Sequence, residues 1–222
     1  MVIWKNINFR NKGIIVEKIP TISKAKKKID VYQIEGRNGF LSVDTGVYEP
    51  FSVSLECHCS DTANIDEIKS FLDGYGTLSF DGVKQYTAII DNTIPFEQVQ
   101  TFKKFQISFL VNPIAEKITA ESIDLTSLSN FSIDTYSEIY PTLTIICSGD
   151  VSININNQIF YLNDTNGTYI LDSKNKEIVD SNGINKSGLM NGDFPFFING
   201  TNSISTTGTI TSIIANYKET YL

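Results

Sequence analysis

The sequence lacks the features of membrane proteins, secreted proteins and disulfide-rich scaffolds. Nowhere do about 18 apolar residues follow one another, as a membrane-spanning helix requires, and the segment Met1–Asn6 has no apolar core of signal-peptide length. Cysteine is scarce: Cys57, Cys59 and Cys147 are an odd number that suits a reducing compartment. We therefore expect a protein made in the cytoplasm without a signal peptide and with no membrane partner.

Motifs of catalysis and cofactor binding are also missing. The chain has no Gly-x-Ser-x-Gly elbow, no P-loop, no His-Glu-x-x-His and no Gly-x-Gly-x-x-Gly. Its single histidine is His58, and a zinc site built on the three cysteines lacks a fourth ligand. Buried cysteines that pack as small apolar side chains are the favoured interpretation. Carboxylate pairs could serve a glycosidase, but a solvated surface explains them better. We therefore predict a protein that is not an enzyme, with no catalytic residue, no metal and no cofactor.

The sequence does have a composition typical of folded proteins and an uneven distribution of charge. Hydrophobic residues make up 41% and aromatic residues 11% of the 222 residues, enough for packed cores. Residues 1–117 carry 14 positive and 14 negative charges, whereas residues 118–222 carry 4 and 11. The whole net charge of −7 therefore lies in the second half. This step predicts two β-rich domains, 1–117 and 118–222.

Apolar and polar residues alternate with period two, which is the pattern of strands in antiparallel sheets. The clearest examples in the first half are Phe51–Cys59 and Lys104–Val111. In the second half, residues 151–156 alternate, and an Asn156-Asn157 turn leads into Gln158–Leu162. That arrangement predicts a hairpin.

One helix is predicted between these strands. Its apolar face consists of Ile65, Ile68, Phe71 and Leu72. The candidates for its N-cap are Ser60, Asp61 and Thr62. Gly74 offers a left-handed stop after the last turn. We expect this helix to cover one side of the first sheet.

A cluster of basic residues precedes a predicted strand at Ile29–Ile34. Its members are Lys24, Lys26, Lys27 and Lys28. One interpretation is a solvated strand edge, because lysines protect edges from stray pairing. The second is a contact for an acidic protein surface. Nucleic acid is the least favoured partner, because the isoelectric point is about 4.7.

The tetrapeptide Gly36-Arg37-Asn38-Gly39 follows that strand. Asn-Gly is a strong signal for a type I′ hairpin turn. The alternative is an exposed loop that presents Arg37 to a neighbouring protein, since arginine is enriched at interfaces. The interface residues that we predict are Lys24, Lys26, Lys27, Lys28, Arg37 and Asn38.

Several short motifs follow one another along most of the chain. In the first half they are the basic strand ending in Gly36-Arg37-Asn38-Gly39, residues 44–50 (DTGVYEP) before the strand Phe51–Cys59, residues 71–74 (FLDG), residues 76–80 (GTLSF) and residues 85–90 (QYTAII). In the second half they are residues 192–197 (GDFPFF), residues 199–202 (NGTN) and a closing strand at Thr209–Tyr217. In this order they resemble the distal tail proteins (Dit) of long-tailed bacteriophages and of phage-derived tail particles.

The resemblance implies a mainly β architecture and a structural role. It implies an N-terminal, split-barrel-like β domain (1–117) with one covering helix, which assembles into a homo-hexameric ring. It also implies a C-terminal, galectin-like β-sandwich (118–222) outside the ring. The ring would belong to the baseplate, join the major tail tube protein to the tail-associated tip protein, and serve as a hub for receptor-binding proteins. DNA would only pass through its lumen. The expected location is the tail tip of a virion, or of a prophage-derived particle, after synthesis in the cytoplasm of the host bacterium.

Two other functions stay open. The first is a carbohydrate-binding β-sandwich module for a glycan of the host cell surface. The aromatic residues that could stack on sugars are Tyr140, Tyr161, Tyr169, Phe194, Phe196 and Phe197. The second is a cell-wall hydrolase, which is the least favoured because no zinc or Cys/His constellation is present.

Overall fold

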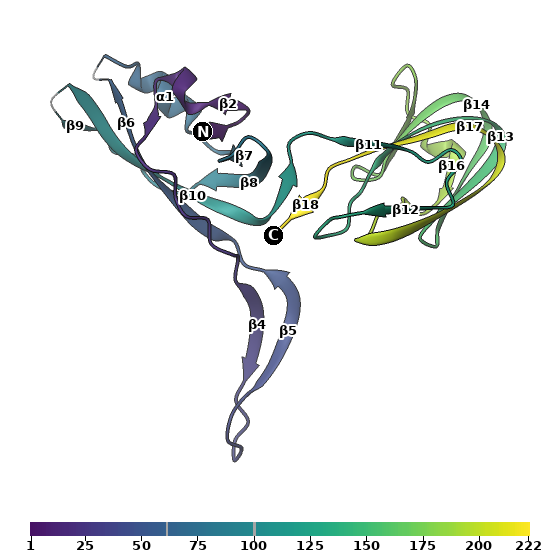
Figure 1. The fold of residues 1–222 in the computed structure, drawn as a ribbon, viewed down its shortest axis with the longest axis horizontal. Helices are drawn as coiled ribbons and strands as arrows, with labels where there is room; N and C mark the ends of the chain where they lie inside the picture. Colours follow the sequence, from purple (N-terminus) through teal and green to yellow (C-terminus); the bar gives the residue numbers. More distant parts are fainter. Residues whose placement is uncertain (61, 100) are drawn as a thin grey trace. The chain divides into compact units, whose positions relative to one another are not determined.

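The computed structural model describes residues 1–60, 62–99 and 101–222 (Figure 1). The chain forms two compact units, Met1–Glu116 together with Leu222, and Lys117–Tyr221. The structure is mainly β, with a curled half-barrel sheet in the first unit and a second sheet in the other. The predicted fold class is therefore confirmed.

The first unit contains a curled sheet and a separate hairpin. Its strands are β1 (Ile3–Trp4), β2 (Ile7–Asn8), β3 (Ile15–Val16), β4 (Lys27–Tyr32), β5 (Leu41–Tyr48), β6 (Phe51–Ser60), β7 (Tyr75–Ser79), β8 (Lys84–Ile90), β9 (Glu97–Val99) and β10 (Phe102–Lys117), with a short 3-10 helix η1 (Phe9–Lys12). The curled sheet has the order β2-β1-β7-β8-β10-β6-β3, and β9 also pairs with β10. Across the described residues, β4 and β5 pair with each other and with no other strand.

Strands β6 and β10 are the longest strands of the curled sheet. They pair in antiparallel register from Phe51 opposite Val111 to Ser60 opposite Phe102. Alternate residues such as Leu55 are buried in the core, and the polar residues between them lie on the other face. Period two places every second side chain on one face, so the alternation read from the sequence is confirmed here.

Helix α1 (Ile65–Phe71) buries Ile68 and Phe71 in the core of the first unit, and Phe71 O accepts a hydrogen bond from Trp4 Nε1 at 3.1 Å. Its N-cap is Asn64, whose side chain accepts from Glu67 N, so the prediction of Ser60 or Thr62 is wrong. The remaining candidate, Asp61, lies outside the described residues. Gly74 does have a left-handed φ of 68°, two residues beyond the C-cap.

The second unit is built on three long strands. Its strands are β11 (Glu121–Asp124), β12 (Asn130–Ile133), β13 (Thr142–Ile155), β14 (Gln158–Asp172), β15 (Glu177–Asp180), β16 (Met190–Gly192), β17 (Gly200–Tyr217) and β18 (Thr220–Tyr221), with a 3-10 helix η2 (Ser187–Leu189). The order is β11-β17-β13-β14-β15, with β12 paired to β17 and β16 to β14. The predicted hairpin is confirmed, because β13 and β14 are joined by Asn156 and Asn157, which both have the positive φ of a type I′ turn.

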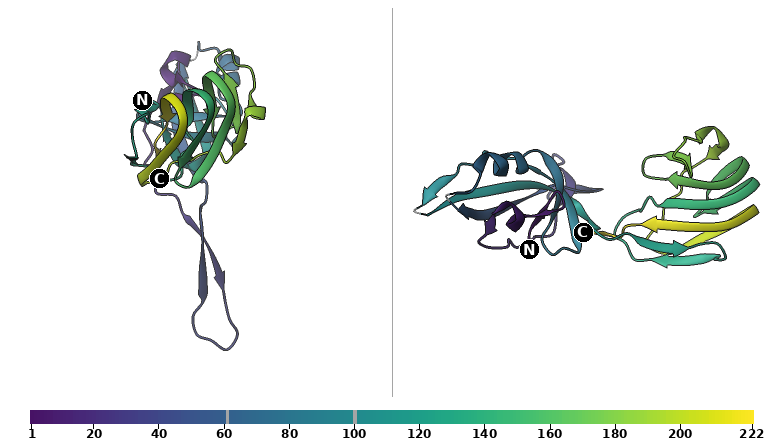
Figure 2. Two further views of the ribbon diagram at one scale, coloured as in Figure 1. Left: turned by 90° about the vertical axis from the view of Figure 1, so that its right-hand side faces the viewer. Right: turned by 90° about the horizontal axis from the view of Figure 1, so that it is seen from above.

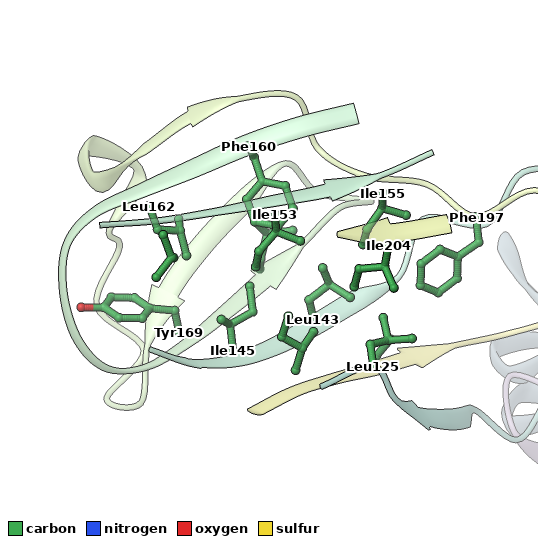
Figure 3. Packing of buried hydrophobic residues seen from close by; sticks show 14 of the residues in the cluster. Leu125, Leu143, Ile145, Ile153, Ile155, Phe160, Leu162, Tyr169, Phe197 and Ile204 are labelled. Atoms are coloured by element: carbon green, nitrogen blue, oxygen red, sulfur yellow. The ribbon is translucent and has the colours of Figure 1, made fainter. Parts of the chain in front are cut away.

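Strands β13, β14 and β17 curl over and enclose a core between their halves. The ladder between β13 and β14 shifts register between Gly149 and Val151, where Gly149 has a φ of 75°. A bulge of this kind bends a strand, so side chains from both halves of β13 meet. Figure 3 shows Ile145 and Ile153 pointing into the same apolar cluster.

In the part of the chain that the structure describes, no helix has the length and apolar character needed to cross a membrane.

Candidate functional site

The hairpin of β4 and β5 extends from the first unit as an arm (Figure 2). We call residues 18–49, which comprise the hairpin and the segment leading into it, the arm. Its two strands pair from Lys27 opposite Tyr48 to Tyr32 opposite Leu41. An isolated two-stranded hairpin is only marginally stable in water, which makes the arm the candidate contact surface of this chain.

All six predicted interface residues lie in the arm and are exposed. Lys24 and Lys26 precede β4, while Lys27 and Lys28 are its first two residues. Arg37 and Asn38 lie in the loop at the tip of the arm. The structure thus brings the basic cluster and the Gly36–Gly39 motif onto a single element.

Two details of the sequence-based prediction are wrong. The strand expected at Ile29–Ile34 begins two residues earlier, so Lys27 and Lys28 belong to the strand instead of preceding it. The Asn38-Gly39 pair does not form a type I′ turn, because Asn38 lacks the positive φ that this turn requires. Residues 33–40 instead form an eight-residue loop, in which Arg37 N donates to Ile34 O at 3.2 Å.

Two of the lysines are already paired within the arm. Lys27 Nζ donates to Asp44 Oδ2, and Lys26 Nζ lies 3.5 Å from Glu49 Oε2. The hydrogen bond to Asp44 raises the pKa of Lys27, and the same bond, with a second from Gly46 N, lowers the pKa of Asp44. Both groups therefore stay charged near neutral pH.

Lys24, Lys28 and Arg37 differ from these two lysines. Among the described residues, no carboxylate forms an ion pair with any of the three. Lys18, which also lies in the arm, likewise has no ion pair among the described residues, so four basic groups of the arm lack a carboxylate partner there.

The apolar residues of the arm are not among the interface residues predicted from the sequence. Large apolar side chains that are exposed here are Ile19, Ile22, Ile29, Val31, Tyr32, Ile34, Phe40, Leu41, Val43 and Val47. Phe40 is 70% exposed and Val31 is 60% exposed. In the sequence these residues have the hydropathy pattern of an ordinary strand. Hydropathy does not show that the described part of the chain leaves them uncovered. The signal in the sequence that marks this segment is the set of adjacent lysines.

The single histidine lies in a polar cluster on β6. His58 Nδ1 is 3.3 Å from Glu17 Oε1, and Lys104 Nζ is 3.1 Å from the same oxygen. The hydrogen bond from Lys104 lowers the pKa of Glu17. These contacts fix Glu17 just after β3, and the contact between Lys104 and Glu17 is an ion pair.

The three cysteines are free and buried. Cys57 and Cys59 lie in the core of the first unit and Cys147 in that of the second. Burial, helped by the charge of Glu17, raises the pKa of Cys57 to about 12, so its thiol stays protonated and unreactive. Within residues 1–60, 62–99 and 101–222, no group of three or more His, Cys, Asp or Glu side chains could hold a metal ion.

The aromatic residues considered for sugar binding divide into three groups. Tyr169 and Phe197 are buried in the core of the second unit, and Phe194 and Phe196 are half-buried. Tyr140 and Tyr161 are exposed at 46% each. The Tyr140 ring leans on Phe196 at a centroid distance of 6.0 Å, and its hydroxyl donates to Glu138 Oε2 at 3.1 Å. Two of the six rings can therefore stack on a ligand.

Comparison with known proteins identifies the fold. No protein-family model and no curated protein matches the sequence. A solved structure, the Dit protein (gp 19.1) of phage SPP1, matches with a TM-score of 0.78 at 12% sequence identity. The match covers 100% of this chain and 98% of that one. The chain has the Dit fold. That protein is described as a paradigm of the hub adsorption apparatus in phages that infect Gram-positive bacteria. The resemblance to Dit proteins read from the sequence is thus confirmed at the level of the fold.

Proposed function

We propose that this protein is a structural component of a phage tail tip. In this role it forms a homo-hexameric ring that joins the major tail tube protein to the tail-associated tip protein. Receptor-binding proteins attach around the ring, and DNA passes through its lumen. The protein therefore resides at the tail tip of a virion or of a phage-derived particle and catalyses no reaction.

The observation that carries this proposal is the full-length match to the Dit fold. It spans both units, so the likeness is one of a whole two-unit molecule and not of a single common β domain. Fold alone does not establish function, and the exposed arm is the independent support. A monomer rarely exposes a contiguous apolar surface of this kind unless a partner covers it.

In this assembly the two units have different tasks. The first unit, which carries the arm, builds the ring. The second unit is the galectin-like β-sandwich outside it, and its net charge of −7 over residues 118–222 keeps that surface solvated.

The test is negative-stain electron microscopy of the purified chain over a range of concentrations. We expect six-fold rings with a central hole. Because some rings form only on a partner protein, the chain is also imaged together with the major tail tube protein of the same particle. Monomers under both conditions would contradict the proposal.

A further inference from the structure

The loop at the tip of the arm contains an asparagine and a following glycine that no hydrogen bond holds in place. Asn38 and Gly39 are exposed and lie outside the strands of the arm. Among the described residues, neither the Asn38 side chain nor the Gly39 amide has a hydrogen-bond partner. A Cβ at Gly39 would meet nothing within 4 Å. Neighbouring atoms therefore leave this pair room to change its conformation.

The other Asn-Gly pairs of the chain are held in regular structure or in hydrogen-bonded turns. They begin at Asn166, Asn182, Asn191 and Asn199. The first lies inside β14 opposite Ser148, and the third lies in β16 opposite Tyr161. The ladders on both sides of these pairs fix the backbone in its extended conformation.

The remaining two pairs are fixed by hydrogen bonds outside a ladder. Asn199 Oδ1 accepts from Thr135 N at 3.3 Å, and the residue after Asn199 begins β17. In the exposed turn at Asn182, the amide of the following glycine donates to Asp180 O at 3.0 Å. Of the five Asn-Gly pairs, the one in the arm thus has the least restrained backbone.

An Asn-Gly pair can react with itself when the glycine nitrogen reaches the side-chain carbonyl carbon of the asparagine. Glycine permits this approach because it has no Cβ to obstruct it. The backbone of the asparagine has to rotate, and the glycine nitrogen has to give up its proton. A pair in a ladder or in a hydrogen-bonded turn must therefore first open locally, which costs free energy. Asn38 and Gly39 need no such opening.

We propose that Asn38 is a site of self-modification, where the chain reacts with water and forms isoaspartate and aspartate. Gly39 N bonds to Asn38 Cγ, the Cγ–Nδ2 bond breaks, and the side-chain nitrogen leaves as ammonia with the amide proton. Water then opens the cyclic imide. Addition at Cγ gives aspartate, and addition at the main-chain carbonyl gives isoaspartate, whose main chain runs through Cγ. Water is the only other reactant, and nothing is oxidised or reduced.

The reaction changes both the charge and the length of the loop. It places a carboxylate next to Arg37, which has no ion pair among the described residues. Residues 18–49 carry 6 positive and 4 negative charges, so their net charge falls from +2 to +1. Isoaspartate also adds one carbon to the main chain. This chemistry is independent of the proposed ring.

The experiment follows the folded full chain over time at mildly alkaline pH. A glutamate-specific protease releases residues 36–49, in which Asn38 is the only asparagine, and mass spectrometry measures its conversion. Isoaspartate is measured with protein L-isoaspartyl methyltransferase and a labelled methyl donor. We expect conversion of Asn38 to be at least about 10-fold faster than at any other Asn-Gly pair. In guanidinium chloride the five pairs should react within about 3-fold of one another, because no local opening is then needed.

Asn182 is the internal control, because it is also exposed but the amide that follows it is hydrogen-bonded. Equal rates at Asn38 and Asn182 in the folded chain would overturn the proposal, as would an Asn38 that reacts only in the denatured chain. Asn38→Gln should remove most of the isoaspartate formed by the folded chain, since its longer side chain closes a less favourable ring. Asn182→Gln should leave it unchanged. Isoaspartate that persisted in Asn38→Gln would place the reaction elsewhere and refute the assignment.

Discussion

At the residue scale, the buried amide of Asn202 holds together the segment that precedes β17. Its Oδ1 accepts from Ile198 N at 2.8 Å and from Asn156 Nδ2 at 2.7 Å, and its Nδ2 donates to the carbonyls of Ile198 and Gly200. The side chain is completely buried. All of its hydrogen-bonding capacity is thus used inside the protein.

We predict that Asn202→Ala lowers the free energy of unfolding of the second unit by about 2–4 kcal/mol, because several buried groups lose their partner at once. The measurement is urea unfolding followed by circular dichroism. The control is Asn182→Ala, an exposed turn position, which should change stability by less than about 0.5 kcal/mol. Equal effects of the two substitutions would contradict this account.

Asp81 gives the first unit a dependence on pH. Its Oδ1 accepts from Val83 N at 2.8 Å and from Lys84 N at 2.9 Å in the turn between β7 and β8. Partial burial opposes ionisation, but the backbone donors of Lys84 and Val83 outweigh it and lower the pKa of Asp81. A carboxyl group whose pKa is lowered by folding stabilises the folded state at pH values above its pKa in the unfolded chain. That stabilisation is lost as the pH falls through its pKa in the folded protein.

We predict that Asp81→Asn lowers the free energy of unfolding by about 1 kcal/mol at pH 7, a small value because the carboxylate is solvated. The difference from the unmodified chain should shrink as the pH falls below the ordinary aspartate pKa of 3.8. The difference in free energy of unfolding is measured by urea unfolding at pH 7 and at about pH 3, monitored by Trp4 fluorescence. A difference that increased toward low pH would contradict the lowered pKa of Asp81.

At the element scale, glycines allow the long strands of the second unit to bend. Gly208 in β17 has a φ of 90°, and a Cβ at this position would lie 2.4 Å from Asp150 O. Only glycine tolerates both this backbone conformation and this approach.

We predict that Gly208→Ala destabilises the second unit by more than about 2 kcal/mol, because the strained φ and the clash add up. Gly188 provides the control, since its φ is not in the left-handed region and nothing lies within 4 Å of its Cβ position. Gly188→Ala should change stability by less than about 1 kcal/mol. Thermal unfolding followed by circular dichroism compares the two variants, and similar midpoints would refute the assignment.

Elements defined by local pattern could be predicted from the sequence. The alternation at Phe51–Cys59 and the Asn156-Asn157 turn are local signals, and both appear in the structure as expected. The bend at Gly149 and Gly208 could not be predicted, because it depends on residues of neighbouring strands meeting across a shifted register.

The candidate site was predictable in part for the same reason. The basic residues from Lys24 to Arg37 mark the right segment, since charge on a strand is visible in the sequence. The exposure of Val31 and Phe40 depends on the absence of a covering layer, which is a property of the whole fold. The N-cap at Asn64 was not predicted, because Ser60, Asp61 and Thr62 are residue types that also favour the N-cap position.

At the scale of the whole molecule, the two units have separate cores. The apolar cluster of the first unit runs from Val2 to Val111 and that of the second from Leu125 to Ala215, with no shared residue among those described. The second unit also ties its own ends together, because Lys117 N donates to Glu219 O and Lys117 Nζ lies 3.3 Å from Glu219 Oε2. Each unit therefore has what it needs to unfold cooperatively by itself.

We predict that the units unfold independently, and the chain contains a probe that can test this. Trp4, the only tryptophan, is buried in the first unit, so its fluorescence reports on that unit alone. Leu78→Ala leaves a cavity in the same core and should lower the free energy of unfolding measured by fluorescence by about 2–5 kcal/mol. It should leave the hydrogen-exchange protection of β13 and β14 unchanged. Asn202→Ala should lower the protection of β13 and β14 and leave the fluorescence transition unchanged. If either variant shifted both signals together, the chain would be one cooperative unit, and a ring built by the first unit would draw its stability from the second.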